Sequence, residues 1–152
     1  PEVERLQGDH RTVGRWTLAQ VCKHLADSIN GSIDGFDLRR HRIKRALFAK
    51  PLLWYTFRFG IPPGYTVDPA LTPPDDVRLD EASTGLREAI ARYQRHDGPL
   101  APHPLFGRLS RAMWDRMQCF HCAHHLRFVW PSEPAPGKQL GEDVDGVADP
   151  HD

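Results

Sequence analysis

The sequence is poor in cysteine, has no long apolar run and carries no formal net charge. Its three cysteines, an odd number in 152 residues, argue against a secreted domain held by disulfides and for a reducing compartment. No apolar stretch approaches the length that crosses a membrane. We therefore expect a cytoplasmic protein, although the chain begins at Pro1 without a methionine, which leaves room for a preceding segment.

Charge is balanced overall but unevenly distributed along the chain. Residues 131–152 hold six of the 20 acidic residues and one lysine, which leaves a basic body. This last segment lacks helical periodicity and large apolar groups, so the sequence predicts a flexible acidic tail over 131–152 and one domain over 1–130. The basic run of residues 39–45 is interpreted as a solvated helix face, and nucleic acid is not expected as a partner.

Helical periodicity and capping signals mark four segments. A capping box at Thr17 begins a helix that runs to about Gly35, and further helices are expected over 36–50, 80–96 and from Ser110 onward. After Pro51 the aromatic stretch 52–59 is expected to form a separate helical piece whose side chains pack. Residues 60–76 contain five prolines and cannot be regular structure. The sequence therefore predicts an all-α four-helix bundle with a long proline-rich crossover between helices two and three.

Three histidines, His121, His124 and His125, lie within about one turn of the last predicted helix. His121 and His125 are four residues apart, close enough to bind one ion, and neutral imidazole is a common ligand of transition metals. Such a site needs a further ligand from elsewhere, and His124 is a better candidate for a pocket-lining residue than for a fourth ligand. His24 lies at the edge of the apolar stripe of the first helix. Histidines satisfied by backbone carbonyls on a helix face remain the alternative interpretation.

Other features carry weaker signals. Cys119 and Cys122 form a CxxC that lies mostly off the histidine face, and a zinc knuckle needs a second such pair. His103, in the loop before the last helix, either overhangs the pocket or, as the default, is exposed to solvent. No carboxylate accompanies the histidines at motif spacing, which weakens the case for a built-in general base.

The order of the motifs resembles a known superfamily. The segments WTLAQVCKHLAD (16–27), HPLFGRLS (103–110) with Trp114, and HCAHHLRF (121–128) together resemble the DinB-like superfamily, and within it the DUF1569 family, over roughly residues 10–130. The resemblance implies a four-helix bundle with a long link between helices two and three. It also implies a divalent metal, such as zinc, nickel or ferrous iron, bound by His24, His121 and His125.

Two hypotheses compete for the function. Some DinB-like proteins are S-transferases or isomerases that use low-molecular-weight thiols, so the first hypothesis is a metal-dependent thiol transferase, or a metal-assisted hydrolase, acting on a small molecule. His124 is the candidate catalytic residue, to move a proton or orient a ligand, with Asp27 or Gln118 in support. The second hypothesis is a non-catalytic metal-binding or interaction bundle. Homodimerisation is compatible with either.

Overall fold

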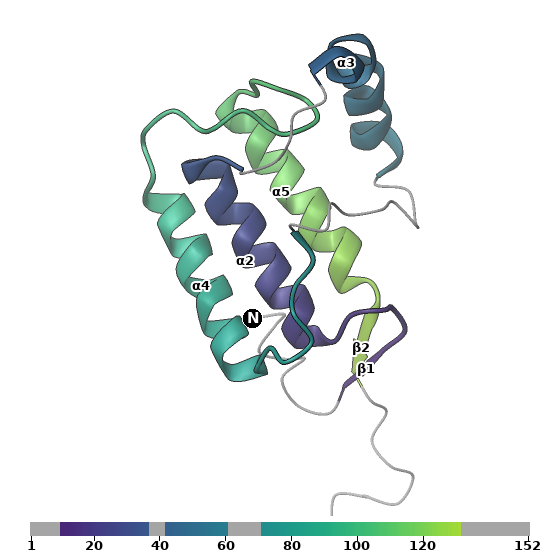
Figure 1. The fold of residues 1–152 in the computed structure, drawn as a ribbon, viewed down its shortest axis with the longest axis vertical. Coiled ribbons are helices and arrows are strands. Elements are labelled where there is room, and N and C mark those ends of the chain that lie inside the picture. Colours follow the sequence, from purple (N-terminus) through teal and green to yellow (C-terminus); the bar gives the residue numbers. More distant parts are fainter. Residues whose placement is uncertain (1–9, 37–41, 61–70, 132–152) are drawn as a thin grey trace, which may run out of the picture.

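The described part of the chain folds into four α-helices and one small antiparallel sheet (Figure 1). In the computed structural model the described residues are 10–36, 42–60 and 71–131, with the backbone alone for 42–48 and 131. The elements, in chain order, are β1 (His10–Thr12), α2 (Leu18–Asp34), α3 (Arg42–Phe59), α4 (Leu79–Arg95), α5 (Arg111–Leu126) and β2 (Val129–Pro131). The predicted all-α fold with four helices is confirmed.

Local sequence signals set both ends of α2. The Thr17 side chain accepts a hydrogen bond from the Gln20 amide (3.2 Å), and the Gln20 side chain accepts one from the Thr17 amide (2.9 Å), which completes the predicted capping box. At the other end Gly35 has a φ of +97°, which residues with a Cβ rarely adopt, so glycine suits this stop. The apolar face that was predicted for this helix is buried, at Leu18, Val21, Cys22, Leu25 and Ile29.

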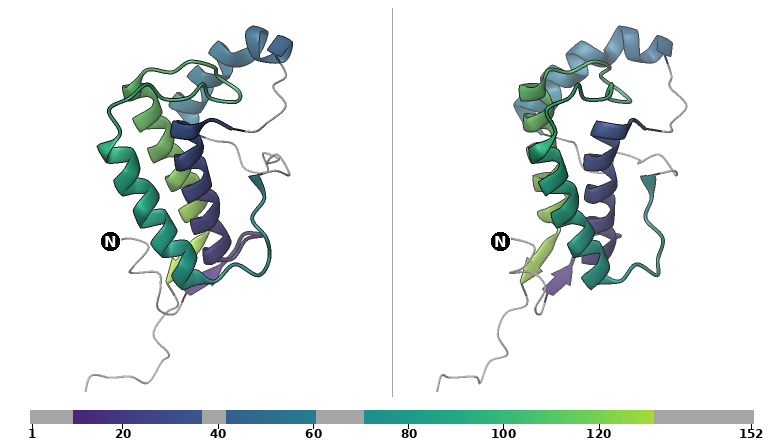
Figure 2. Two further views of the ribbon diagram at one scale, coloured as in Figure 1. Left: turned by 60° about the vertical axis from the view of Figure 1, so that its left-hand side comes forward. Right: turned by 90° about the vertical axis from the view of Figure 1, so that its left-hand side faces the viewer.

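Helix α4 packs along α2 and runs parallel to it (Figure 2). Near the end of α4, Arg92 donates to both carboxylate oxygens of Asp34 (2.6 and 2.7 Å), the last residue of α2. Parallel neighbours need a connection that returns along their length, and residues 71–78 are the described last part of it, within the predicted crossover. The inner face of α4 is formed by four buried residues, Ala82, Leu86, Ala89 and Tyr93, whereas Ile90 is 39% exposed.

Helix α5 packs against α2 in the antiparallel direction (Figure 1). Ser110 is its N-cap, as predicted, since the side chain accepts a hydrogen bond from the Met113 amide (3.3 Å). One turn into the helix, Trp114 is almost completely buried, and its Nε1 donates to the Ala101 carbonyl (3.2 Å). Because this anchor fixes the start of α5, the register of the histidines further along the helix is fixed as well.

Helix α3 differs from the prediction in two ways. It is one helix with Pro51 inside it, whereas two pieces were expected; proline removes one intrahelical hydrogen bond, but the backbone stays helical on both sides. The predicted packing of its aromatic residues is also wrong for Trp54, Tyr55 and Phe59, which are exposed. Phe57 does contact another helix, with its ring centroid 5.9 Å from that of Phe120.

A two-stranded sheet that the sequence did not predict joins the two ends of the described chain. Strands β1 and β2 pair in antiparallel register, with Arg11 opposite Trp130, and the Val13 amide donates to the Phe128 carbonyl (2.9 Å). Such short strands lack a clear alternating pattern, which explains why they were missed. The pairing holds the residues before α2 beside the end of α5, and so brings Trp16 to the histidines.

Several expectations lie outside the described residues. They are the side chains of the basic run 39–45 and the tail from residue 132 onward. In the part of the chain that is described, no helix combines the length and the apolar character required to cross a bilayer.

Candidate metal centre

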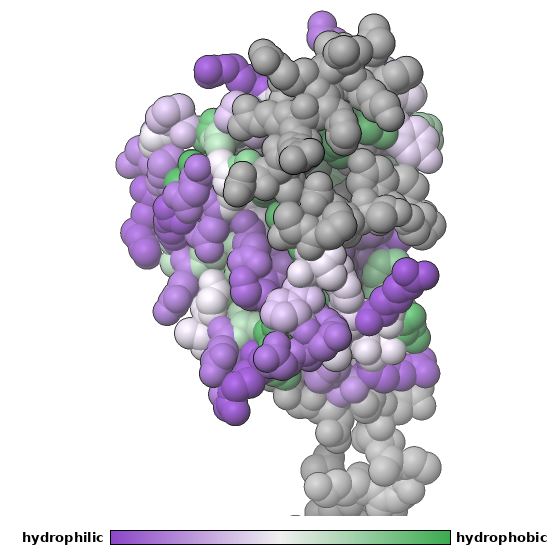
Figure 3. Space-filling view, in the orientation of Figure 1, coloured by the Kyte–Doolittle hydropathy of each residue, from purple (hydrophilic) through white to green (hydrophobic). Residues whose placement is uncertain are grey.

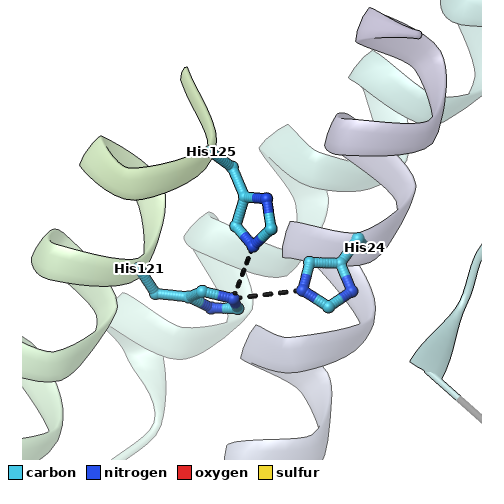
Figure 4. A group of neighbouring side chains, drawn as sticks. All are labelled: His24, His121 and His125. Atoms are coloured by element: carbon cyan, nitrogen blue, oxygen red, sulfur yellow. Dashed lines mark hydrogen bonds between the residues drawn. The ribbon is translucent and has the colours of Figure 1, made fainter. Parts of the chain in front are cut away.

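Three histidine side chains from α2 and α5 converge on one point (Figure 4). The Nε2 atom of His121 lies 3.1 Å from Nε2 of His24 and 3.1 Å from Nε2 of His125. One ring nitrogen from each of the three residues lies within 4.8 Å of the others. The structure therefore brings together the three residues that were predicted to be ligands, although 97 positions separate His24 from His121.

The crossover fixes the orientation of His24. This residue is buried, and its Nδ1 lies 3.0 Å from the backbone carbonyl oxygen of Leu71. Because a carbonyl oxygen can only accept, Nδ1 carries the ring proton and donates it to Leu71. The Nε2 atom of a neutral His24 therefore has a free lone pair, which points toward the other two rings.

The other two rings are held by neighbours from different elements. Nδ1 of His121 lies 3.2 Å from the Ser28 hydroxyl, one turn after His24 on α2. The ring of His125 stacks on Trp16, with centroids 5.5 Å apart and an interplanar angle of 9°. Trp16 also lies against His24, at 4.8 Å between centroids. Contacts from α2 and from the segment before it therefore orient both rings of α5.

Burial keeps all three imidazoles neutral. It lowers the pKa of His24, and it lowers the pKa of His121 well below the usual value, with a further contribution from the neighbouring histidines. For His125 burial, together with the charges nearby, lowers the pKa to about 3. Metal binding requires unprotonated imidazole nitrogen, so near neutral pH no proton has to be displaced from these rings.

The donor set fits a transition metal better than a purely hydrogen-bonded cluster. A neutral His121 has either one N–H or one lone pair at Nε2, so it cannot form ordinary hydrogen bonds with both neighbouring Nε2 atoms. Zinc binds imidazole at 2.0–2.1 Å, which places the nitrogens of a tetrahedral site about 3.3 Å apart. The observed 3.1 Å separations are close to this spacing. The three-histidine group can therefore hold a metal ion.

His124 lies beside the cluster but does not belong to it. Its ring is perpendicular to that of His125, at 5.1 Å between centroids, and it also lies against Phe128 at 5.8 Å. It is not among the three residues whose nitrogens converge. Of the two suggested supporting groups, Gln118 is buried, while Asp27 is bound by Lys23 at 2.6 Å and acts on His24 only through its charge.

His103 is partly buried, so the default expectation of solvent exposure is wrong. Its ring packs between Phe106 and Trp114, at 4.6 and 5.2 Å between centroids. Nδ1 accepts hydrogen bonds from the amides of Leu105 (3.1 Å) and Phe106 (3.3 Å), which orders the loop before α5. His103 therefore stabilises the loop, and its nitrogens are not part of the three-histidine cluster.

The cysteines lack the features of an activated thiol pair. Cys119 is exposed and Cys122 is partly buried, and both are free, as is the buried Cys22. Burial raises the pKa of Cys122 to about 11, and that of Cys22 to about 11 as well. Protonated thiols of this kind are poor nucleophiles and poor ligands at neutral pH.

An open groove, lined by both charged and apolar residues, lies between α2 and α4. None of the three histidines lines it. Two of its charged side chains, Lys23 and Asp27, pair with each other (2.6 Å), and a third, Arg92, pairs with Asp34 outside the groove (2.6 Å). Hydrophilic residues dominate the α4 side of the surface (Figure 3). The groove therefore has the character of a solvated helix boundary.

Sequence reasoning missed the groups that orient the histidines. Ser28 had a usable signal, because its spacing from His24 equals the spacing of His121 from His125, which places it on the same face of α2. The Leu71 carbonyl had none, since any residue carries a backbone oxygen. Trp16 had none either, because only the unpredicted sheet explains its contact with His125.

The fold and the site define a class of protein: an all-α, four-helix chain with a three-histidine cluster between α2 and α5. A family profile described as "Protein of unknown function (DUF1569)" matches residues 2–132, so the chain belongs to the DUF1569 family. No curated protein and no solved structure matches the chain.

Proposed function

We propose that His24, His121 and His125 bind one divalent metal ion and that this centre is the functional site of the protein. The single observation that supports this most strongly is the convergence of three neutral imidazole nitrogens on one point, two of the pairs at 3.1 Å. Zinc, nickel and ferrous iron all accept imidazole ligands. The hydrogen bonds of His24 to Leu71 and of His121 to Ser28 also support a metal site, because metal-binding histidines usually have a partner on the second ring nitrogen that fixes the ring orientation.

His24, His121 and His125 would hold the metal, and the metal would supply the Lewis acidity that lowers the pKa of a water or thiol. We therefore propose a metal-dependent reaction on a small molecule, either a thiol-dependent transfer of the DinB-like type or a metal-assisted hydrolysis. His124, next to His125, is the group proposed to carry or relay a proton. The Asp27 carboxylate, which acts on His24 through its charge, is already paired with Lys23, so a histidine is the better base here.

A non-catalytic metal-binding bundle is the second candidate. It is favoured by the packing of Trp16 over two of the three rings, since an aromatic wall also suits a closed structural site. The two candidates differ in one measurable property: a catalytic centre exchanges a small ligand such as azide or a thiol at the metal, and a closed one does not. Cobalt-substituted protein would report such exchange through its visible spectrum.

The ligand set is tested by metal uptake in single variants prepared without a histidine tag. His24→Ala, His121→Ala and His125→Ala are each expected to lose at least 100-fold in zinc affinity, because each removes one of three ligands. His124→Ala is the matched control on the same helix, and its zinc affinity should stay within a few-fold of the parent protein. Equal losses in all four variants, or no loss in the first three, would show that the ligand assignment is wrong.

A further inference from the structure

Ser28 faces the central histidine of the cluster from the opposite helix. Its hydroxyl oxygen lies 3.2 Å from Nδ1 of His121. On α2, His24 and Ser28 are four residues apart, as His121 and His125 are on α5, so two pairs of side chains meet across the helix interface. We propose that Ser28 is a positioning residue that holds the His121 ring with Nε2 directed at the metal. This inference rests on the proposed function.

His121 is the ring whose orientation matters most. Its Nε2 is the atom that both other histidines approach, each at 3.1 Å. A rotation of this one ring would therefore break both 3.1 Å contacts, whereas a rotation of His125 would leave the contact between His24 and His121 intact. A single hydrogen bond at Nδ1 of His121, such as the one with Ser28, therefore stabilises both contacts of the cluster.

The hydroxyl of Ser28 has the chemistry that this position needs. When Nε2 binds a cation, the ring proton of a neutral His121 is on Nδ1, and the Ser28 oxygen accepts it. A hydroxyl can also donate, so it can pair with the other neutral tautomer before metal uptake. His24 differs, because the Leu71 carbonyl can only accept and permits one tautomer. Because Ser28 can donate or accept, His121 can adopt either neutral tautomer, whereas His24 adopts only one.

Other polar side chains nearby do not replace Ser28. The Asp27 carboxylate, one residue earlier, is bound by Lys23 through both oxygens at 2.6 Å. Ser32, one turn later on α2, donates to the Ile29 carbonyl at 2.6 Å and is fully buried. Ser32 is therefore a matched control: a serine on the same helix whose hydroxyl serves the backbone and not a histidine.

The experiment compares zinc affinity in the full chain by competition with a chromophoric chelator. Ser28→Ala is expected to bind zinc about 10- to 100-fold more weakly, the usual effect of removing a partner that orients a ligand. Ser28→Thr keeps the hydroxyl and should stay within about threefold of the parent protein. Ser32→Ala should also leave the affinity unchanged, which separates the effect from a general weakening of α2.

A second readout follows the ring itself. Nitrogen-15 spectra of the zinc-loaded protein should show the His121 Nδ1 protonated and hydrogen-bonded in the parent and in Ser28→Thr. In Ser28→Ala the same resonance should shift or broaden, because the ring has lost its partner. A loss of helix content does not produce this selective change, so the spectrum distinguishes positioning from folding.

The outcomes separate this inference from the proposed function. If the parent protein binds zinc and Ser28→Ala binds it equally well, with an unchanged His121 resonance, the role of Ser28 is refuted while the metal centre stands. If Ser28→Thr is as weak as Ser28→Ala, the hydroxyl is not the cause and the role is likewise refuted. If the parent protein takes up no metal, both proposals fail together.

Discussion

The buried histidines of this protein differ in what each Nδ1 atom contacts. His24 donates to a backbone carbonyl, His121 contacts a hydroxyl, and His103 accepts from two backbone amides. The same ring atom therefore has three different kinds of partner. These partners decide which ring nitrogen is free to bind an ion, and a sequence does not display backbone partners. Residue type and spacing predicted the pair His121 and His125, and the family resemblance added His24, but the tautomers could not be predicted.

A pH-dependent loss of stability is expected at His103. Burial lowers its pKa to about 4, whereas the unfolded chain protonates histidine near 6.5. The unfolded state thus takes up the proton first, so stability is fully present above about pH 6.5 and falls as the pH drops toward about 4. Protonation also places a hydrogen on Nδ1, against the amides of Leu105 and Phe106. Urea denaturation should show a loss of about 1–2 kcal/mol from this residue between pH 7 and 5.

His103→Asn is the matched variant for this prediction. Its side-chain oxygen can accept from the same amides, but it does not titrate in this range. The variant should therefore show a shallower fall in stability between pH 7 and 5 than the parent protein. Identical slopes for the two proteins would show that His103 does not carry this pH dependence.

At the scale of secondary-structure elements, helical spacing accounts for most of what could be predicted. The four-residue interval puts His121 and His125 on one face of α5, and the capping signals at Thr17 and Ser110 start α2 and α5 where expected. These signals depend only on neighbouring residues, so they can be recognised without knowledge of the tertiary structure. Pro51 shows the limit of the same approach, because a proline penalty of a few kcal/mol does not always end a helix.

The capping box of α2 gives a prediction for this element. Thr17→Ala removes the acceptor of the Gln20 amide and should cost about 1 kcal/mol in the free energy of unfolding. Thr17→Ser keeps the acceptor and should lose at most a few tenths of this. Urea denaturation of the two variants measures both values. An equal loss in the two would indicate that the methyl group, and not the cap, stabilises the start of α2.

At the scale of the whole molecule, contacts between residues far apart in the sequence assemble the site. These contacts could not be predicted from the sequence. The crossover returns to α2, where the Gln20 side chain donates to the Pro74 carbonyl (3.3 Å) and to a carboxylate oxygen of Asp75 (3.0 Å). Four residues along α2, His24 donates to Leu71 of the same segment. The proline content predicted a crossover but not its route, because the route depends on these contacts across about 50 residues of chain.

A metal that joins α2 and α5 should stabilise the fold as a whole. At a free zinc concentration of about 100 times the Kd, binding to the native state alone adds about 2.7 kcal/mol. For a chain of this size that corresponds to a rise in Tm of roughly 5–10 °C. Calorimetry should show this rise for the parent protein and none for His121→Ala. A similar rise in both proteins would place the stabilising ion elsewhere.

The measurement that tests the central claim most directly is X-ray absorption at the metal edge of the zinc-loaded, tag-free protein. The structure predicts one zinc per chain with three imidazole nitrogens at about 2.0–2.1 Å, completed by a light atom from solvent or substrate. Scattering from sulfur at about 2.3 Å would assign the ion to the cysteines. That result, or fewer than three imidazoles, would contradict a centre formed by His24, His121 and His125.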